Sequence, residues 1–266
     1  MTLDRFSALP QKKIVSIFCT AGFPRRDDTR AVLISLENAG ASMIEVGFPF
    51  SDPVADGPTI QAANVRSLSQ GMNSHLLFSQ LRGMREEIAI PVLLMGYLNP
   101  VEQYGAEAFF AAAAECGVDG LILPDMPFED YLERYKILYQ RYSLRPVFFV
   151  TSRTSEARIR AFDQEAPAFL YVLSSDAITG GRATVSVERE AFFKKLAEMG
   201  LSSRLVVGFG VQDRTSYEGV TRHTAGAIVG SAFVRALENL KVGDSPHHSD
   251  MRQLDSVIND FVAEFL

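Results

Sequence analysis

Two acidic residues, Glu45 and Asp56, stand in contexts that favour acid–base chemistry. Glu45 lies inside the short apolar run 43–46, which is typical of a strand buried on both faces, and a buried carboxylate is costly unless it has a partner or a task. Asp56 follows eleven residues later (56 − 45), on a loop that two prolines stiffen. One carboxyl group is thus fixed near a strand end and the other lies on the following loop, so that they can hold different protonation states.

Each of these acids also has a purely structural explanation. Glu45 could belong to a buried ion pair, and Asp56 in Asp-Gly-Pro has the composition of a turn. Asp52, directly before Pro53, is another turn residue, and we expect it to be structural.

A second group of candidates is glycine-rich and lies late in the chain. Gly208-Phe209-Gly210 ends one apolar run, and Gly230-Ser231 ends the next and opens a helix. Backbone N–H groups of a glycine loop and of a helix N-terminus can bind a phosphate, and barrels often place one after strands 7 and 8. Glycines that only serve turns are the alternative.

The segment 174–184 is small and polar and carries paired glycines, as a mobile lid would, although a plain exposed loop would look the same. Aromatic residues near the ends of apolar runs could form the wall of a site for a flat apolar ligand, or could simply belong to the hydrophobic core. They are Phe18, Tyr97, Tyr171 and Phe209.

Composition excludes several classes of function. The net charge of −6 argues against binding to nucleic acid or an anionic membrane, and no run approaches the roughly 18 apolar residues that span a bilayer. The N-terminus lacks a signal-peptide pattern, and two cysteines in apolar segments are typical of reduced core residues, so the cytoplasm is expected. The four histidines show no ligand spacing, and no metal site is expected.

Eight short apolar runs alternate with segments of helical period, which predicts parallel strands joined by helices. In one domain of 266 residues this favours a (β/α)8 TIM barrel over a doubly wound sheet, because no glycine-rich turn follows the first run. Helices are expected at 29–39, 58–70, 74–87, 103–116 and 250–264, one of them an extra helix between the second and third runs. The eight runs are 14–19, 43–46, 92–97, 120–123, 146–150, 169–173, 205–209 and 225–230.

The segment from Glu45 to Gln61, Glu-Val-Gly-Phe-Pro-Phe-Ser-Asp-Pro-Val-Ala-Asp-Gly-Pro-Thr-Ile-Gln, resembles the signature of the tryptophan synthase alpha chain family. The resemblance extends over nearly the whole chain and its motifs are specific. Further matching segments are 20–24, 95–100, 117–125, 208–211 and 226–232.

The resemblance implies a retro-aldol cleavage of indole-3-glycerol phosphate into indole and glyceraldehyde 3-phosphate, without metal or organic cofactor. By position, Glu45 would be the acid and base, and Asp56 would stabilise charge at the ring nitrogen. Thr179 matches the lid threonine placed over the catalytic aspartate. The phosphate site would comprise Gly180, Gly210, Gly230 and Ser231. The indole pocket would comprise Phe18, Ile60, Met95, Ile122, Tyr171, Phe209 and Ile228.

Two segments depart from the family pattern. Ala177 stands where many members have a lid glycine, which would slow or restrict closure, and 151–154 differs from the usual sequence after strand 5.

The resemblance also implies a partner: a pyridoxal-phosphate beta subunit in an α2β2 complex, to which indole passes directly. Three alternatives remain open at this point. They are a free-standing indole-3-glycerol-phosphate lyase, a catalytically weak subunit that mainly activates the beta chain, and an unrelated phosphosugar isomerase or epimerase on the same barrel.

Overall fold

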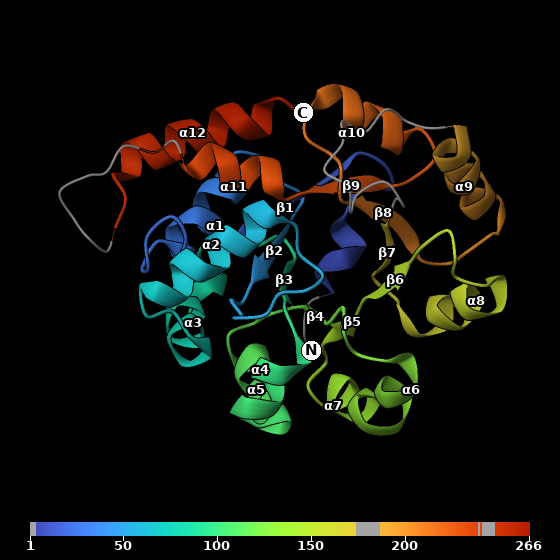
Figure 1. Ribbon diagram of the computed structural model, residues 1–266, viewed down its shortest axis with the longest axis horizontal. Coiled ribbons are helices and arrows are strands. Elements are labelled where there is room, and N and C mark those ends of the chain that lie inside the picture. The colour runs from blue at the N-terminus through green and yellow to red at the C-terminus, as the bar shows by residue number, and fades with distance from the viewer. Residues whose placement is uncertain (1–3, 174–186, 239, 241–247) are drawn as a thin grey trace.

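A ring of parallel strands lies at the centre of the molecule, with helices around it (Figure 1). The computed structural model describes residues 4–173, 187–238, 240 and 248–266. The strands within this part of the chain are β1 Ile14–Thr20, β2 Met43–Gly47, β3 Val92–Met95, β4 Gly120–Ile122, β5 Arg145–Pro146, β6 Phe148–Val150, β7 Phe169–Leu173, β8 Arg204–Gly208 and β9 Gly226–Val229.

The strand order is that of a (β/α)8 barrel with one strand divided. The order is β5-β4-β3-β2-β1-β9-β8-β7-β6. The fifth apolar run forms both β5 and β6: Arg145 and Pro146 pair with β4, and residues 148–150 pair with β7. The predicted barrel is therefore confirmed, with a break in backbone pairing at Val147.

The predicted helices 29–39, 58–70 and 250–264 match the structure to within one residue at each end, and two predicted helices do not. The helix expected at 74–87 ends at Leu81, and Gly83 with φ 72° precedes a separate short helix, η2 Met84–Glu86. The single helix expected at 103–116 is wrong, because Gly105 with φ 92° separates two helices. The helical elements are η1 Arg5–Ala8, α1 Thr29–Asn38, α2 Pro58–Ser69, α3 Ser74–Leu81, η2 Met84–Glu86, α4 Leu98–Tyr104, α5 Ala106–Glu115, α6 Phe128–Asp130, η3 Tyr131–Tyr135, α7 Lys136–Arg141, α8 Glu156–Glu165, α9 Val187–Glu198, α10 Arg214–Thr221, α11 Ser231–Glu238 and α12 Met251–Ala263.

Alternate residues of each strand belong to two separate apolar cores. Val15, Ile17 and Cys19 of β1 belong to the outer core between the sheet and the helices, whereas Ile14 and Phe18 belong to the core inside the barrel. Successive strand side chains point to opposite faces, so Glu45 of β2, between the outer residues Ile44 and Val46, points into the barrel.

Three strand ends carry a glycine because an aromatic ring lies against the backbone there. A Cβ on Gly47 would overlap the ring of Phe18, and a Cβ on Gly208 would overlap the ring of Tyr171. Gly96, directly after β3, faces the ring of Phe48 in the same way. These glycines let the aromatic rings lie close against the backbone at the carboxyl ends of the strands.

The N-terminal end of the barrel is closed by η1. Phe6 belongs to the inner core, and the guanidinium of Arg5 donates to Asp119 Oδ1 at 3.0 Å. Asp119 Oδ2 also accepts from the guanidinium of Arg85 and, at 2.8 Å, from the backbone N–H of Val92. This buried carboxylate therefore ties the N-terminal segment to the sheet, and the opposite end is left for a ligand.

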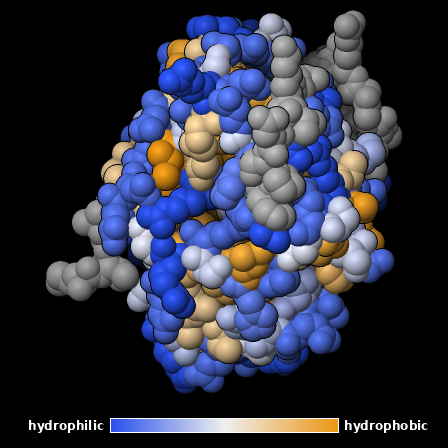
Figure 2. Space-filling model, turned by 90° about the vertical axis from the view of Figure 1, so that its left-hand side faces the viewer, coloured by the Kyte–Doolittle hydropathy of each residue, from blue (hydrophilic) through white to orange (hydrophobic). Residues whose placement is uncertain are grey.

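The face of the molecule shown in Figure 2 is mainly hydrophilic, with hydrophobic residues in small separate groups. Among the described residues, no helix has the length and apolarity to span a membrane.

Candidate active site

Glu45 lies deep in the barrel with very little polar contact. Its side chain is 0% exposed, and its register neighbours are Phe18 on β1 and Leu93 on β3, both apolar. Oε1 accepts a long hydrogen bond of 3.4 Å from the hydroxyl of Ser16, and Oε2 has no hydrogen-bond partner among the described residues. The ion pair considered above for this carboxyl group is absent from the described part of the chain.

This environment favours the neutral form of the carboxyl group. Burial raises the pKa of Glu45 to about 8, and the hydrogen bond from Ser16 opposes that shift only in part. The charged form loses its hydration inside the barrel without a compensating cation. At neutral pH Glu45 therefore carries a proton that it can donate.

Asp56 lies on the loop after β2 in a more polar setting. The Tyr97 hydroxyl donates to Asp56 Oδ2 at 3.1 Å and itself accepts from the backbone N–H of Ala55 at 3.0 Å. Burial raises the pKa of Asp56 to about 6, while hydrogen bonds from Tyr97 and Asn64 favour its ionised form. Asp56 is thus ionised at a pH at which Glu45 is still protonated.

The two carboxyl groups belong to the same region of the barrel. The charges of Glu45 and Asp56 both act to raise the pKa of the buried Tyr171 hydroxyl, in addition to the larger effect of its burial. Asp56 also lines a small pocket together with Phe18 and Met95, residues of the inner core into which Glu45 points.

The residues predicted for the apolar pocket lie together. Phe209 has a positive φ of 67°, and its ring lies 6.3 Å from that of Tyr171, centroid to centroid. All seven belong to the inner core or pack against it: Phe18, Ile60, Met95, Ile122, Tyr171, Phe209 and Ile228. The structure therefore brings them together, and their contact with a substrate stays a prediction.

Three of the four residues predicted to bind phosphate can be placed. Gly210 follows β8 with φ 78°, and Gly230 and Ser231 lie where β9 leads into α11. Gly230 is also next to the inner core, because a Cβ there would lie 3.4 Å from Phe18 and 3.6 Å from Ile60. Thr179 and Gly180, like Ala177 and the rest of the predicted lid 174–184, lie outside the described residues.

Sequence reasoning missed one residue beside Asp56, Asn64, and missed the contact of a second, Tyr97, which it names only as an aromatic residue that could line a ligand site or belong to the core. Asn64 lies four residues after Ile60 in α2, and residues four apart share a helix face; this spacing was the available signal. Asp52, expected to be structural, accepts a hydrogen bond from the Ser51 hydroxyl at 2.6 Å and is exposed.

The divergent segment after the fifth strand forms a compact turn. The Thr154 hydroxyl accepts from the backbone N–H of Thr151 at 3.0 Å, and Ser155 caps α8 by accepting from the N–H of Arg158 at 3.3 Å. Hydroxyl groups thus fix the local shape of this turn.

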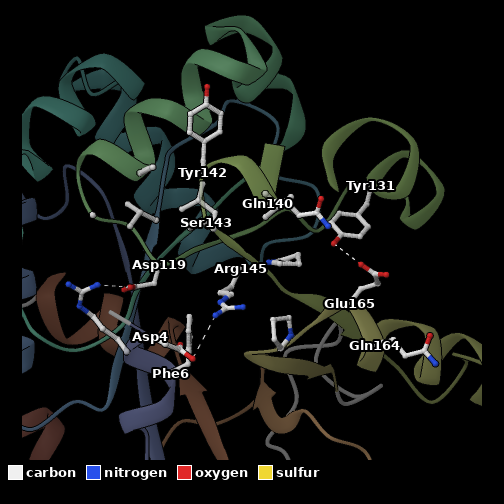
Figure 3. A pocket seen from close by; sticks show the side chains of 18 residues that line it. Asp4, Phe6, Asp119, Tyr131, Gln140, Tyr142, Ser143, Arg145, Gln164 and Glu165 are labelled. Atoms are coloured by element: carbon white, nitrogen blue, oxygen red, sulfur yellow. Dashed lines mark hydrogen bonds and ion pairs between the residues drawn. The ribbon is translucent and has the colours of Figure 1, made fainter. Parts of the chain in front are cut away.

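A cavity of about 760 Å³, larger than the pocket beside Asp56, lies at the other end of the barrel; Figure 3 shows its lining. Charged side chains that line it have partners: Arg145 lies 3.7 Å from Asp4, and Glu165 accepts a hydrogen bond from the Tyr131 hydroxyl at 3.1 Å. Active sites of such barrels lie at the carboxyl ends of the strands. This cavity adjoins the amino ends of β4 and β5, so size alone does not make it the catalytic site.

No group of three or more His, Cys, Asp or Glu side chains within the described ranges could hold a metal ion. The polar groups gathered at the carboxyl ends of the strands are instead carboxyl, phenol and amide groups. Such groups are suited to binding a small organic molecule and moving protons on it.

The fold and the site together define a (β/α)8-barrel enzyme with two carboxyl groups held in different protonation states. The family model described as "Tryptophan synthase alpha chain" matches residues 6–261. The chain belongs to the tryptophan synthase alpha chain family. The predicted family is thus confirmed, and so are the predictions that the chain is a lyase and that it serves tryptophan biosynthesis.

Individual relatives are similar over most of their length. The tryptophan synthase alpha chain of Parabacteroides distasonis is 45% identical over 226 residues, which is 85% of this chain and 88% of that one. The tryptophan synthase alpha chain of Phocaeicola vulgatus is 42% identical over 248 residues, 93% of this chain and 96% of that one.

Solved structures give the same result. Tryptophan synthase subunit alpha from Legionella pneumophila str. Paris has a TM-score of 0.81 at 30% identity, covering 96% of this chain and 93% of that one. A chain in the tryptophan synthase complex from Pyrococcus furiosus has a TM-score of 0.82 at 26% identity, covering 96% and 98%. Membership of this family implies a beta-subunit partner.

Proposed function

We propose that the chain cleaves indole-3-glycerol phosphate into indole and glyceraldehyde 3-phosphate by acid–base catalysis, with Glu45 and Asp56 in distinct roles. The observation that carries this proposal is the contrast between the two carboxyl groups. Glu45 is fully buried with a pKa raised to about 8, whereas Asp56, beside Tyr97, has a pKa of about 6.

Glu45 acts first as an acid. The indole ring is a poor leaving group until C3 is protonated, so the neutral carboxyl group gives its proton to that carbon. The resulting carboxylate then takes the proton of the hydroxyl on the adjacent side-chain carbon. As the C–C bond breaks, its electron pair restores the aromatic ring, and the alcohol carbon leaves as the aldehyde. Glu45 ends the cycle protonated, as it began.

Asp56 stabilises the charge that forms in between. Protonation of C3 places positive charge on the ring nitrogen, and a fixed carboxylate near that nitrogen lowers the energy of the intermediate. Tyr97 and Asn64 hold Asp56 in its ionised form, which is the form that this role requires.

Binding relies on the inner core and on the ends of β8 and β9. Flat apolar rings such as those of Phe18 and Tyr171 suit an indole ring. The N-terminus of α11 with Gly230 and Ser231, and Gly210 after the neighbouring strand β8, supply backbone N–H groups for a phosphate. Gly180 and Thr179 stay in the proposal as predicted phosphate and lid residues. The reaction needs no metal or organic cofactor in this chain.

We also propose that the partner is a pyridoxal-phosphate beta subunit in an α2β2 complex that receives the indole. The loop between β2 and α2 carries Asp56 and exposes Val54 (83% exposed), so it is suited to contact that partner and to sense it. A cytoplasmic location stays a prediction.

The test is indole release from indole-3-glycerol phosphate, assayed with and without a beta subunit. Wild type is expected to release indole and to be stimulated clearly by the partner. Glu45→Gln keeps the shape of the side chain and removes the acid, so kcat should fall at least about a hundredfold. Asp56→Asn is the companion variant and should also be slow.

Circular dichroism spectra of the variants control for folding. Full activity of Glu45→Gln would refute the assigned roles, and wild-type turnover that ignores the partner would indicate a free-standing lyase.

A further inference from the structure

Ser16 is a polar residue buried next to Glu45 that the proposed reaction does not yet use. It lies in β1, is 0% exposed and alternates with the outer residues Val15 and Ile17, so it points into the barrel. A hydroxyl buried among apolar groups is unfavourable unless it forms a hydrogen bond. Its hydroxyl donates a hydrogen bond to Glu45 Oε1 at 3.4 Å.

The register of the strands places this contact on the deep side of the carboxyl group. Glu45 lies opposite Phe18 of β1, and Ser16 is two residues earlier, opposite Met43. Because all strands run toward the catalytic end, Ser16 is one layer further from the opening than Glu45. The hydroxyl therefore approaches the carboxyl group from below, while Oε2 has no hydrogen-bond partner among the described residues.

Burial is the larger influence on the pKa of Glu45, and the hydrogen bond from Ser16 is the side-chain contact that opposes it. Cys19 on β1 and Tyr171 on β7 both interact with the charge of Glu45. Burial raises the pKa of Cys19 to about 12 and raises the pKa of Tyr171 well above its usual value. Both stay neutral near pH 8. On the remaining side, β3 contributes the apolar Leu93 at the register position of Glu45.

We propose that Ser16 is a positioning residue that holds Glu45 Oε1 and so assigns the proton transfers with substrate to Oε2. This rests on the proposed role of Glu45. A hydroxyl donates one hydrogen bond, and a carboxylate accepts more strongly than a neutral acid does. Ser16 thus also stabilises the ionised form in the middle of the reaction, when Glu45 has given up its proton.

The experiment compares Ser16→Ala and Ser16→Val, which lack the hydroxyl, with Ser16→Thr, which keeps it. Val and Thr have nearly the same shape, so this pair separates the hydroxyl from packing. Rates of indole release are measured from pH 6 to 10, with the beta subunit present. Ser35→Ala is the matched control, because Ser35 is also a buried serine that donates to a carboxylate, Asp255 at 2.5 Å, but on α1 outside the barrel.

The hydrogen bond from Ser16 lowers the pKa of Glu45, so its loss should raise that pKa. The alkaline limb of the pH profile of kcat should then move to higher pH by about half a pH unit, the scale of one hydrogen bond between a neutral donor and the carboxylate. At pH 7, kcat should fall roughly threefold to tenfold with KM unchanged. Ser16→Thr should keep the wild-type limb, and so should Ser35→Ala. Infrared spectra of the protonated carboxyl band, identified by its loss in Glu45→Gln, read the same titration without turnover.

The assignment to Ser16 would be overturned if Ser16→Ala and Ser16→Val had the same alkaline limb of kcat and the same titration of the carboxyl band as wild type. The role of Glu45 would then still stand. A Glu45→Gln enzyme that keeps its activity would instead overturn the proposed function itself. If Ser16→Val does not fold, the comparison of Ser16→Ala with Ser16→Thr decides the question.

Discussion

Glu45 and Asp56 differ in how much polar support each receives. Glu45 is held by one long hydrogen bond from Ser16, whereas Asp56 accepts from Tyr97 and is supported by Asn64. Desolvation raises the pKa of both, and hydrogen bonding to the charged form opposes it more for Asp56. The same functional group is thereby set to donate a proton in one place and to hold a negative charge in the other.

The pH dependence of indole release should follow from these two pKa values. Asp56 must be ionised, so activity should fall as the pH drops through about 6, and Glu45 must be protonated, so activity should also fall as the pH rises through about 8. The expected profile of kcat is a bell with its maximum between these limits. In Asp56→Asn the acidic limb should disappear while the alkaline limb remains.

The measurement is kcat under saturating substrate across pH 5 to 10, with a stability check at each pH. A rate that keeps rising above pH 9 would contradict the role of Glu45 as the first acid.

Sequence alone could indicate that Glu45 is buried, because the apolar run around it allows no other reading. It could not indicate the partners of Asp56. Tyr97 is 41 residues away, and its hydroxyl reaches Asp56 only because β2 and β3 are neighbours with Gly47 opposite Met95. Such a contact depends on strand register, which an apolar run does not specify on its own.

Among the elements, the carboxyl ends of the strands combine glycine backbone with aromatic side chains. The ring of Tyr171 lies against Gly208, and the ring of Phe18 against Gly47. Absence of Cβ lets each ring approach the neighbouring strand closely. The walls of the apolar site are thus set by the strands themselves, which are more rigid than loops.

Gly208→Ala should disturb this wall. The added Cβ would overlap the Tyr171 ring, which would have to move, so KM for the substrate should rise on the order of tenfold. Overpacking of this kind should also lower stability by about 1–3 kcal/mol. Steady-state kinetics and urea unfolding measure the two effects.

Gly57→Ala is the control for stability, since nothing lies within 4 Å of a Cβ there and its φ is −74°. Unchanged KM in a folded Gly208→Ala variant would show that the Tyr171 ring is not part of the binding wall.

Element positions were largely predictable, since apolar runs such as 169–173 coincide with strands. The division of the fifth strand was not, because 146–150 reads as one run and only the pairing partners of its two halves distinguish them. The break at Gly105 was missed because Phe109 and Phe110 continue the apolar pattern of the helix that follows.

At the scale of the whole molecule, the two ends of the barrel have different tasks. The carboxyl ends of the strands carry the chemistry, and the amino ends carry the buried contacts of Asp119 with Arg5 and Arg85. Such a division is general for this fold. It allows a change at one end to leave the other intact.

Asp119→Ala should therefore lower stability without slowing the reaction. Removal of this carboxylate leaves two partly buried guanidinium groups without their shared partner, a change that typically costs about 3–5 kcal/mol. Urea unfolding measures the loss, and kcat in the absence of urea should stay within about twofold of wild type.

Glu107→Ala removes an ion pair with Arg141 in which both side chains are more than half exposed, and should change stability by less than about 1 kcal/mol. Equal losses in the two variants would contradict the special role of Asp119.

The divided fifth strand has a consequence for how the protein behaves in crowded solution. If the ring opens transiently at Val147, the edges it presents are β5 and β6, of two and three residues. Edges this short offer few free backbone groups to the strand of a neighbouring molecule. The junction of β5 and β6, where the ring lacks backbone pairing, thus offers little edge for another chain to pair with. This limits edge-to-edge aggregation of the protein.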